Sequence, residues 1–189
     1  MQRAREVAAV ALGYAVEGPA DFNLGAPGLQ PAWLPAVQAS PYAVFFHGTA
    51  RAAKQWPEAN WMALGNRLAS HGLAVLLPWG SAAEHEAAQR IAAGIPGAQV
   101  LPKLPLMEAV TLAQRAALIV GVDTGLTHIA AAFGRPTVEL YCDSPRWKTE
   151  GNWSPRIINL GDTGAPPDVA QVITAALSLL DRPATRPAC

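Results

Sequence analysis

The chain contains little cysteine and no long apolar segment. Only Cys142 and Cys189 occur among its 189 residues, which is too few for a disulfide framework or a zinc site, so we expect a protein of the reducing cytosol. No apolar run reaches the length of a membrane span, and the first residues have the pattern of an amphipathic helix rather than of a signal peptide. The sequence therefore predicts a cytoplasmic, globular protein.

An excess of one charge and the common nucleotide-binding signatures are also missing. The 14 Lys and Arg residues balance the 14 Asp and Glu residues, so no overall field would recruit nucleic acid or an anionic membrane. No Gly-x-Gly-x-x-Gly follows an expected strand and no Gly-Lys-Ser of a P-loop occurs, which disfavours a dinucleotide-binding protein and a P-loop NTPase. No arrangement of Cys, Ser or metal ligands suggests covalent or metal catalysis, and we expect no cofactor and no metal.

What the chain does have, from residue 41 onward, is a regular alternation of strands and helices. Strands are expected at residues 42–46, 73–77, 99–101, 116–122, 137–141 and, at the sheet edge, 156–160. Helices are expected at residues 58–71, 106–117, 126–133 and 167–180, with another that Ser81 caps. This alternation predicts right-handed βαβ units, and hence an α/β fold with a Rossmann-like parallel sheet that helices cover on both faces.

The first forty residues have a different character. After a helix expected over residues 1–16, the chain is polar and rich in turn residues, with no strand pattern. Nothing there would form a second core. We therefore expect residues 1–40 to be a helix and linker, residues 41–165 to be the Rossmann-like domain, and residues 166–189 to be a closing helix and tail.

The segment from Leu118 to His128 is the most informative part of the chain, because it has the pattern of a buried strand, a tight turn and a helix start. Asp123 would stand at the carboxyl end of the strand, where open α/β sheets bind ligands. Thr124 has the chemistry of an N-cap, Gly125 permits a close approach of a ligand, and His128 would lean back toward the same place. Because free N–H groups at a helix start bind anions, the segment fits a phosphate-bearing, polyhydroxylated ligand, although helix capping alone would also explain it.

Other loops should meet at the same sheet edge. After the first strand, Thr49 can hydrogen-bond a phosphate and Lys54 supplies a mobile, exposed positive charge. After the second strand, Glu84 could accept hydrogen bonds from two ribose hydroxyls, or could simply favour the helix dipole. The proline-stiffened loop over residues 101–106 offers an apolar edge for a purine. Trp56 is expected to anchor a helix start rather than to contact a ligand.

Taken together, these segments resemble the C-terminal half of the bacterial lipopolysaccharide heptosyltransferases of glycosyltransferase family 9, and of their type I members in particular. The matching residues are His47-x-Thr49-x4-Lys54-x-Trp56-Pro57, Leu77-Pro-Trp-Gly80 with Glu84, Val100-Leu-Pro-Lys103, and Val122-Asp-Thr-Gly-Leu-Thr-His128. The resemblance covers residues 41–141 well. It implies a GT-B architecture, in which two Rossmann-like domains face a cleft and the C-terminal one holds the nucleotide sugar.

The resemblance also implies substrates and roles. The donor would be ADP-L-glycero-β-D-manno-heptose (ADP-heptose), the acceptor the inner Kdo of Kdo2-lipid A, and the place of action the cytoplasmic face of the inner membrane. The substrate-binding residues would be Thr49, Lys54, Thr124, Gly125 and His128 for the diphosphate, Glu84 for the ribose and Asp123 for the heptose hydroxyls, with Leu126 in the same set.

The chain departs from the family in having one expected Rossmann unit instead of two. In the family the acceptor site and the aspartate general base lie in the N-terminal half, so we expect no catalytic residue here and a chain that binds donor but catalyses little. Two alternatives stay open: another GT-B sugar transferase or nucleotide-sugar 2-epimerase, and a non-catalytic nucleotide-binding module of flavodoxin-like form. Such a module would have no need for Lys54, Glu84, Asp123 and His128 to face one pocket.

Overall fold

A computed structural model describes residues 2–22, 24–25, 28–33 and 40–181. Parts of the expected linker, at residues 34–39, and the expected tail at residues 182–189, with Cys189, lie outside the described residues. In the part that is described, no helix combines the length and the apolar character that crossing a bilayer requires.

The core of the molecule is one six-stranded sheet in which every neighbouring pair of strands is parallel. The strands are β1 (Tyr42–Phe46), β2 (Ala74–Leu77), β3 (Gln99–Val100), β4 (Leu118–Val122), β5 (Thr137–Tyr141) and β6 (Ile157–Gly161), in the spatial order β3-β2-β1-β4-β5-β6. Strands β1, β4 and β5 are buried along their whole length, and β1 and β4 accordingly carry continuous apolar runs rather than alternating patterns, whereas β5 includes Thr137 and Glu139. The predicted parallel sheet is confirmed, with β6 at its edge.

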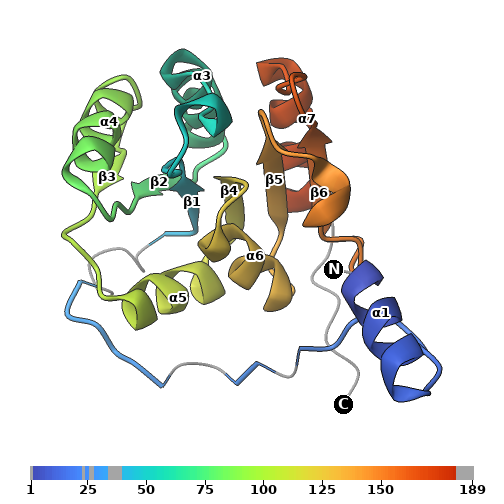
Figure 1. Ribbon diagram of the computed structural model, residues 1–189. Helices are drawn as coiled ribbons and strands as arrows, with labels where there is room; N and C mark the ends of the chain where they lie inside the picture. The colour runs from blue at the N-terminus through green and yellow to red at the C-terminus, as the bar shows by residue number, and fades with distance from the viewer. Residues whose placement is uncertain (1, 23, 26–27, 34–39, 182–189) are drawn as a thin grey trace.

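Helices cover both faces of the sheet (Figure 1). On one face lie α3 (Glu58–Ala69), α4 (Ala82–Ala93) and α7 (Val169–Leu180), and on the other lie α5 (Leu106–Arg115) and α6 (Gly125–Ala132). Each face has its own apolar cluster: Phe45, Trp61 and Leu77 belong to the first, and Val44 and Ile119 to the second. The Rossmann-like architecture expected from the sequence is therefore confirmed.

Element boundaries differ from the expectations by a few residues. The helix expected over residues 106–117 ends at Arg115, because Ala116 takes an extended conformation with ψ of 145°, and β4 begins only at Leu118. Helix α1 (Gln2–Leu12) is shorter than expected and ends where Gly13 takes a φ of +71°. That left-handed conformation is one that glycine adopts readily and that ends helices.

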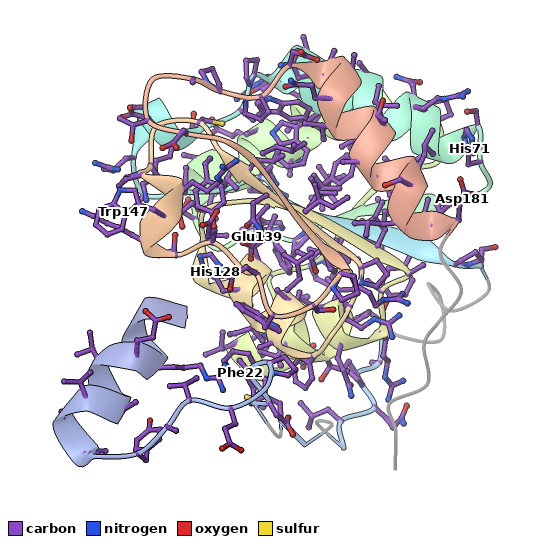
Figure 2. All side chains as sticks on the ribbon, turned by 90° about the vertical axis from the view of Figure 1, so that its right-hand side faces the viewer. Phe22, His71, His128, Glu139, Trp147 and Asp181 are labelled. Atoms are coloured by element: carbon purple, nitrogen blue, oxygen red, sulfur yellow. The ribbon has the colours of Figure 1, made fainter. Side chains whose placement is uncertain are left out.

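Helix α1 stands apart from the sheet and its covering helices (Figures 1 and 2). Arg5 donates hydrogen bonds to the carbonyl oxygens of Glu17 and Gly18, so the helix is held to the turn that follows it. Further along, Trp33 Nε1 donates to Glu108 Oε2 at 2.7 Å, which fastens the connecting segment to α5. The described residues between 13 and 33 contain no strand, as the sequence predicts.

Candidate functional site at the carboxyl edge of the sheet

The candidate residues follow strands that are neighbours in the sheet. Thr49 lies in the loop after β1 and Lys54 in the short 3-10 helix η1 (Ala52–Lys54) of the same loop. Glu84 lies in the first turn of α4, which follows β2, and Asp123 comes directly after β4. Because β2, β1 and β4 are adjacent and parallel, their carboxyl ends lie at one edge, and the predicted convergence of these loops is confirmed.

Helix α6 begins at this edge without a side-chain cap. Thr124 occupies the N-cap position, as predicted, with φ of −146° and ψ of 156°, but its side chain makes no capping hydrogen bond. A Cβ atom added at Gly125 would meet nothing within 4 Å. The start of α6 therefore has open space beside it and a positive dipole end, which are the features of an anion site.

Lys54, Asp123 and His128 form a compact charge cluster. Lys54 Nζ donates to Asp123 Oδ2 at 2.6 Å, and His128 Nε2 lies 3.1 Å from Asp123 Oδ1. The side chains are 19%, 10% and 20% exposed, respectively. His128 thus leans back toward the strand end as predicted, whereas the expectation of an exposed, mobile Lys54 is wrong because Asp123 holds it.

The cluster continues into the sheet through Glu139, a residue of β5 whose side chain is fully buried (Figure 2). Glu139 Oε1 lies 3.0 Å from His128 Nδ1. Its other oxygen, Oε2, accepts hydrogen bonds from the Tyr141 hydroxyl at 2.9 Å and from the Gly151 backbone N–H at 3.1 Å. Lys54, Asp123, His128 and Glu139 therefore form a chain of alternating charges.

The pKa values in this cluster shift in the directions that pairing requires. The hydrogen bond from His128, together with that from Lys54, holds the pKa of the Asp123 carboxyl well below its usual range despite partial burial. Burial alone would lower the pKa of His128, but its hydrogen bonds and charge interactions with Asp123 and Glu139 raise that pKa to about 9. At neutral pH the cluster therefore contains an imidazolium between two carboxylates.

Glu84 lies where two hollows meet. Its carboxylate Oε2 accepts hydrogen bonds from the backbone N–H groups of Gly80, at 2.7 Å, and Ser81, at 3.2 Å, and the Ser81 hydroxyl caps α4 in return. The predicted capping by Ser81 is confirmed. A Cβ at Gly48 would lie only 2.5 Å from Glu84 Cδ, so glycine at position 48 lets the first loop pass directly over this carboxylate.

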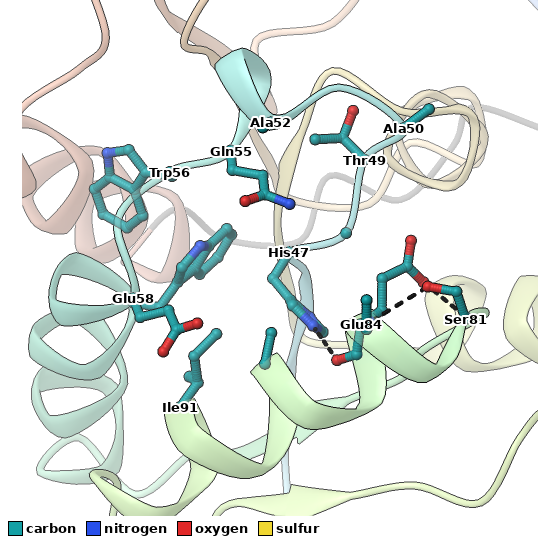
Figure 3. A pocket seen from close by; sticks show the side chains of 14 residues that line it. His47, Thr49, Ala50, Ala52, Gln55, Trp56, Glu58, Ser81, Glu84 and Ile91 are labelled. Carbon is teal, nitrogen blue, oxygen red and sulfur yellow. Dashed lines mark hydrogen bonds between the residues drawn. The ribbon is translucent and has the colours of Figure 1, made fainter.

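On one side of Gly48 and Glu84 lies a hollow of about 500 Å³, which we call the polar hollow (Figure 3). It lies between the first loop and helices α3 and α4, and Thr49, Gln55 and Glu58 line it. His47 and Trp56 are also on its wall. His47 is buried, with Nε2 3.1 Å from the Glu84 carbonyl oxygen, and Trp56 Nε1 donates to the Pro167 carbonyl oxygen at 2.9 Å. The predicted anchoring role of Trp56 agrees with this burial.

On the other side lies a hollow of about 340 Å³, which we call the apolar hollow. Most of its wall is apolar, from Phe46, Pro78, Trp79, Leu104, Leu106, Ala109 and Leu126, and it also includes Gly48, Gly80, Glu84 and Thr124. Trp79 is fixed in this wall because its Nε1 donates to the Leu101 carbonyl oxygen at 2.7 Å. An apolar hollow beside a helix N-terminus suits a nucleobase whose phosphates reach that terminus.

The candidate residues therefore occupy three adjoining places and not one simple pocket. Glu84, Thr124 and Leu126 line the apolar hollow, and Thr49 lines the polar hollow together with Glu84. The remaining candidates with ionisable side chains, Lys54, Asp123 and His128, form the charge cluster beside them. All of them lie at the carboxyl edge of the sheet.

Two residues of the cluster escaped the sequence analysis. Glu139 was counted only as part of the strand at residues 137–141, although a carboxylate in a buried apolar strand is itself a signal of a functional or paired charge. Thr149 follows the 3-10 helix η2 (Arg146–Lys148) and donates from Oγ1 to Asp123 Oδ1 at 3.1 Å. Nothing in its local sequence distinguishes it. Among the described residues, no group of three or more His, Cys, Asp or Glu side chains is arranged to hold a metal ion.

A parallel sheet with helices on both faces, and with an apolar hollow and a helix start at its carboxyl edge, places the protein in the Rossmann-like class of α/β domains. The model of glycosyltransferase family 9 (heptosyltransferase) matches residues 1–175, and the chain belongs to this family. Its fold is that of the Rossmann-like C-terminal domain of a GT-B glycosyltransferase, as the resemblance implies.

Three known proteins illustrate the similarity. Lipopolysaccharide heptosyltransferase 1 of Pseudomonas aeruginosa is 44% identical over 142 residues, which are 75% of this chain and 39% of that protein. The structure of Escherichia coli heptosyltransferase WaaC with ADP has a TM-score of 0.71 and 32% identity, covering 94% of this chain and 54% of that one. Escherichia coli ADP-heptose lps heptosyltransferase II has a TM-score of 0.66 and 28% identity, with coverages of 76% and 47%. The chain thus spans about half the length of these relatives.

Proposed function

We propose that this domain binds the nucleotide-sugar donor of an inverting heptosyltransferase that transfers L-glycero-D-manno-heptose from ADP-heptose during lipopolysaccharide core synthesis. One observation carries the proposal: the apolar hollow, the uncapped start of α6 and the Lys54–Asp123–His128 cluster adjoin at one sheet edge. The adenine fits the apolar hollow, the diphosphate the helix start, and the sugar the charged cluster.

Each candidate residue has a task that its position supports. Thr49, Lys54, Thr124 and Gly125 would contact the diphosphate and the positive charge of His128 would attract it, while Glu84 would contact the ribose and Asp123 the heptose hydroxyls, with Leu126 against the nucleoside. Negative charge grows on the departing diphosphate as the glycosidic bond breaks, and fixed donors that already surround it stabilise that charge. Solved relatives support a donor of this kind, since Escherichia coli WaaC has been solved with ADP and with ADP-2-deoxy-2-fluoro heptose.

We infer that neither Asp123 nor Glu139 is the general base. Such a base must accept a proton from the acceptor hydroxyl, so its carboxylate needs a free oxygen and a pKa that is not strongly depressed. Asp123 accepts from Lys54, His128 and Thr149, and the hydrogen bond from His128, followed by that from Lys54, keeps its pKa low. Glu139 is fully buried. The base, and the site for the inner Kdo of Kdo2-lipid A at the inner-membrane surface, are proposed to belong to other parts of the full-length enzyme.

We propose the corresponding division of this chain: a connecting helix and linker over residues 1–40, a donor-binding domain over residues 41–165, and a closing helix with a tail over residues 166–189. The closing helix α7 packs on the same sheet face as α3, so it completes the donor domain rather than forming a unit of its own.

Calorimetric titration of this chain with ADP, UDP, AMP and ADP-heptose tests the proposal. We expect ADP to bind about tenfold or more tightly than UDP, because a purine fills the apolar hollow better, and more tightly than AMP, because α6 and Lys54 hold the second phosphate. ADP-heptose should bind at least as tightly as ADP. Equal binding of all four ligands, or of none, would contradict the proposal.

A further inference from the structure

Glu139 is a charged residue in the centre of the sheet. Its side chain has no exposure to solvent, and burying a carboxylate is costly unless hydrogen bonds and an opposite charge compensate for it. Both compensations are present: His128 Nδ1 lies 3.0 Å from Oε1, while the Tyr141 hydroxyl and the Gly151 N–H donate to Oε2. A purely apolar side chain would stabilise the strand more simply, so the carboxylate calls for a specific reason.

The contacts of His128 with two carboxylates determine the protonation state of its imidazole ring. Nδ1 faces Glu139 and Nε2 faces Asp123, and carboxylates only accept hydrogen bonds. Both ring nitrogens can therefore bond at once only if both carry a proton. The imidazole orientation is then fixed at two points, one on β5 and one at the end of β4.

Charged residues on the neighbouring elements have partners of their own. In the segment that follows β5, Arg146 pairs with Glu150 and Lys148 lies over the Trp147 ring. Lys54, on η1, reaches the ring only through Asp123. Helix α6 carries no other charged residue. Helix α5, which packs against α6, carries Glu108, which accepts from Trp33, and Arg115, which donates to the Leu29 carbonyl oxygen.

We propose that Glu139 is a positioning residue of the donor site: it holds His128 as a doubly protonated ring whose Nε2–H fixes the Asp123 carboxylate next to Lys54, where that carboxylate meets the donor sugar. This inference rests on the proposed function for the sugar-binding role of Asp123. Glu139 itself contacts no substrate, because strand β5 buries it completely beneath His128.

Glu139→Gln separates charge from shape. Glutamine has nearly the same size and keeps an oxygen for the Tyr141 and Gly151 donors, but its amide faces His128 with N–H groups or with a neutral oxygen. The ring then has no charged partner on that side, and its second proton is held less tightly. Glu150→Gln is the matched control, because Glu150 pairs with Arg146 near the same cluster and has no contact with His128.

The first measurement is an NMR titration of the His128 ring nitrogens in the ligand-free protein. In the unaltered chain we expect both nitrogens to be protonated at pH 7.5, with a midpoint near pH 9. Glu139→Gln should lower the midpoint by about one pH unit or more, whereas Glu150→Gln should leave it unchanged. A neutral His128 at pH 7.5 in the unaltered chain would overturn the inference, and this result does not depend on whether Glu139→Gln folds. If Glu139→Gln does fold, an unshifted midpoint in that variant would also overturn it.

The second measurement compares the affinities for ADP and ADP-heptose. We expect Glu139→Gln to reduce the affinity for ADP-heptose relative to ADP by about tenfold, because a mispositioned Asp123 affects the sugar and not the nucleotide. An unchanged ratio in a variant that still binds ADP would overturn the positioning role alone. If the unaltered chain bound neither ligand, the proposed function would fail and the inference with it, whatever the titration showed.

Discussion

Lys54 Nζ lies 2.6 Å from Asp123 Oδ2, and this ion pair joins the loop after β1 to the end of β4. Because Lys54 already has an anionic partner, an arriving diphosphate would have to share it with Asp123 or draw it away. That exchange would free an oxygen of Asp123 for a sugar hydroxyl when the nucleotide binds. Under the proposed function, the ion pair would therefore couple recognition of the phosphates to recognition of the sugar.

Replacing Lys54 with methionine should weaken both ligand binding and the fold. We expect the affinity for ADP to fall by about 1.5–3 kcal/mol, the range for a hydrogen bond to a charged group. The unfolding free energy should also fall, by on the order of 1 kcal/mol, because Asp123 loses its ion-pair partner. Calorimetry and urea unfolding measure the two effects. Arg67→Met, which removes an exposed cation at the far end of α3, is the control and should change neither.

The stability of the domain should fall in mildly alkaline solution. The pKa of His128 is raised from its ordinary value of 6.5 to about 9 in the folded protein, so its stabilisation is complete below about pH 6.5 and is lost as the pH rises through 9. Urea unfolding between pH 6 and 9.5 should show this decrease, and His128→Gln should flatten it. The control is His71→Gln, at an exposed histidine that Figure 2 labels. This variant should show the same dependence of stability on pH as the unaltered chain.

Gly125→Ala should distinguish ligand binding from folding. A Cβ at this position meets nothing within 4 Å, and alanine favours helix over glycine, so the unfolding free energy should stay constant or rise by a few tenths of a kcal/mol. The same methyl group would occupy the space beside the α6 N-terminus, and we expect ADP affinity to fall about tenfold. Undiminished ADP binding would show that the phosphates lie elsewhere.

Gly121→Ala, unlike Gly125→Ala, should lower the free energy of unfolding. A Cβ here would lie 2.1 Å from Thr127 Oγ1, which donates to the Val122 carbonyl oxygen, so α6 would have to move away from β4. Overpacking of this kind costs about 1–3 kcal/mol. Thermal unfolding measures the loss, and the Gly121→Ala/Thr127→Ala double variant should recover part of it. A fully stable single variant would mean that α6 packs less closely on β4 than described.

The isolated chain should not catalyse heptose transfer. Incubated with ADP-heptose and Kdo2-lipid A, it should form no product above background, because the cluster carboxylates Asp123 and Glu139 are both occupied as hydrogen-bond acceptors. Mass spectrometry of the lipid detects transfer, and a longer family member serves as the positive control. Efficient transfer by this chain would mean that the general base is one of its own residues.

Local patterns in the sequence predicted most of the fold. The bounds of β1 and β5 agree with the expectation residue for residue: β1 is an unbroken apolar run after a proline, and β5 starts directly after Pro136. The end of α5 was misplaced because Ala116 and Ala117 are as compatible with a helix as with the start of a strand. Boundaries between two apolar elements have no local marker.

The site was predictable as far as its signals were local. Asp123, Gly125 and His128 lie within one strand–turn–helix segment, so their grouping follows from a single pattern. The pairing of Lys54 with Asp123 and of His128 with Glu139 depends on which strands are neighbours, and the sequence does not state that order. The low exposure of Lys54 was missed for the same reason, because its partner Asp123 follows β4 whereas Lys54 follows β1.

The position of β1 in the middle of the sheet has a consequence for synthesis of the chain. β1 pairs with β2 on one side and with β4 on the other, and Ala43 is in register with Leu118. During translation, one flank of an entirely apolar strand therefore lacks its partner until residues 118–122 have left the ribosome. Unpaired apolar strands associate with one another, so we expect nascent chains and fragments that end before residue 118 to aggregate more readily than chains that include β4.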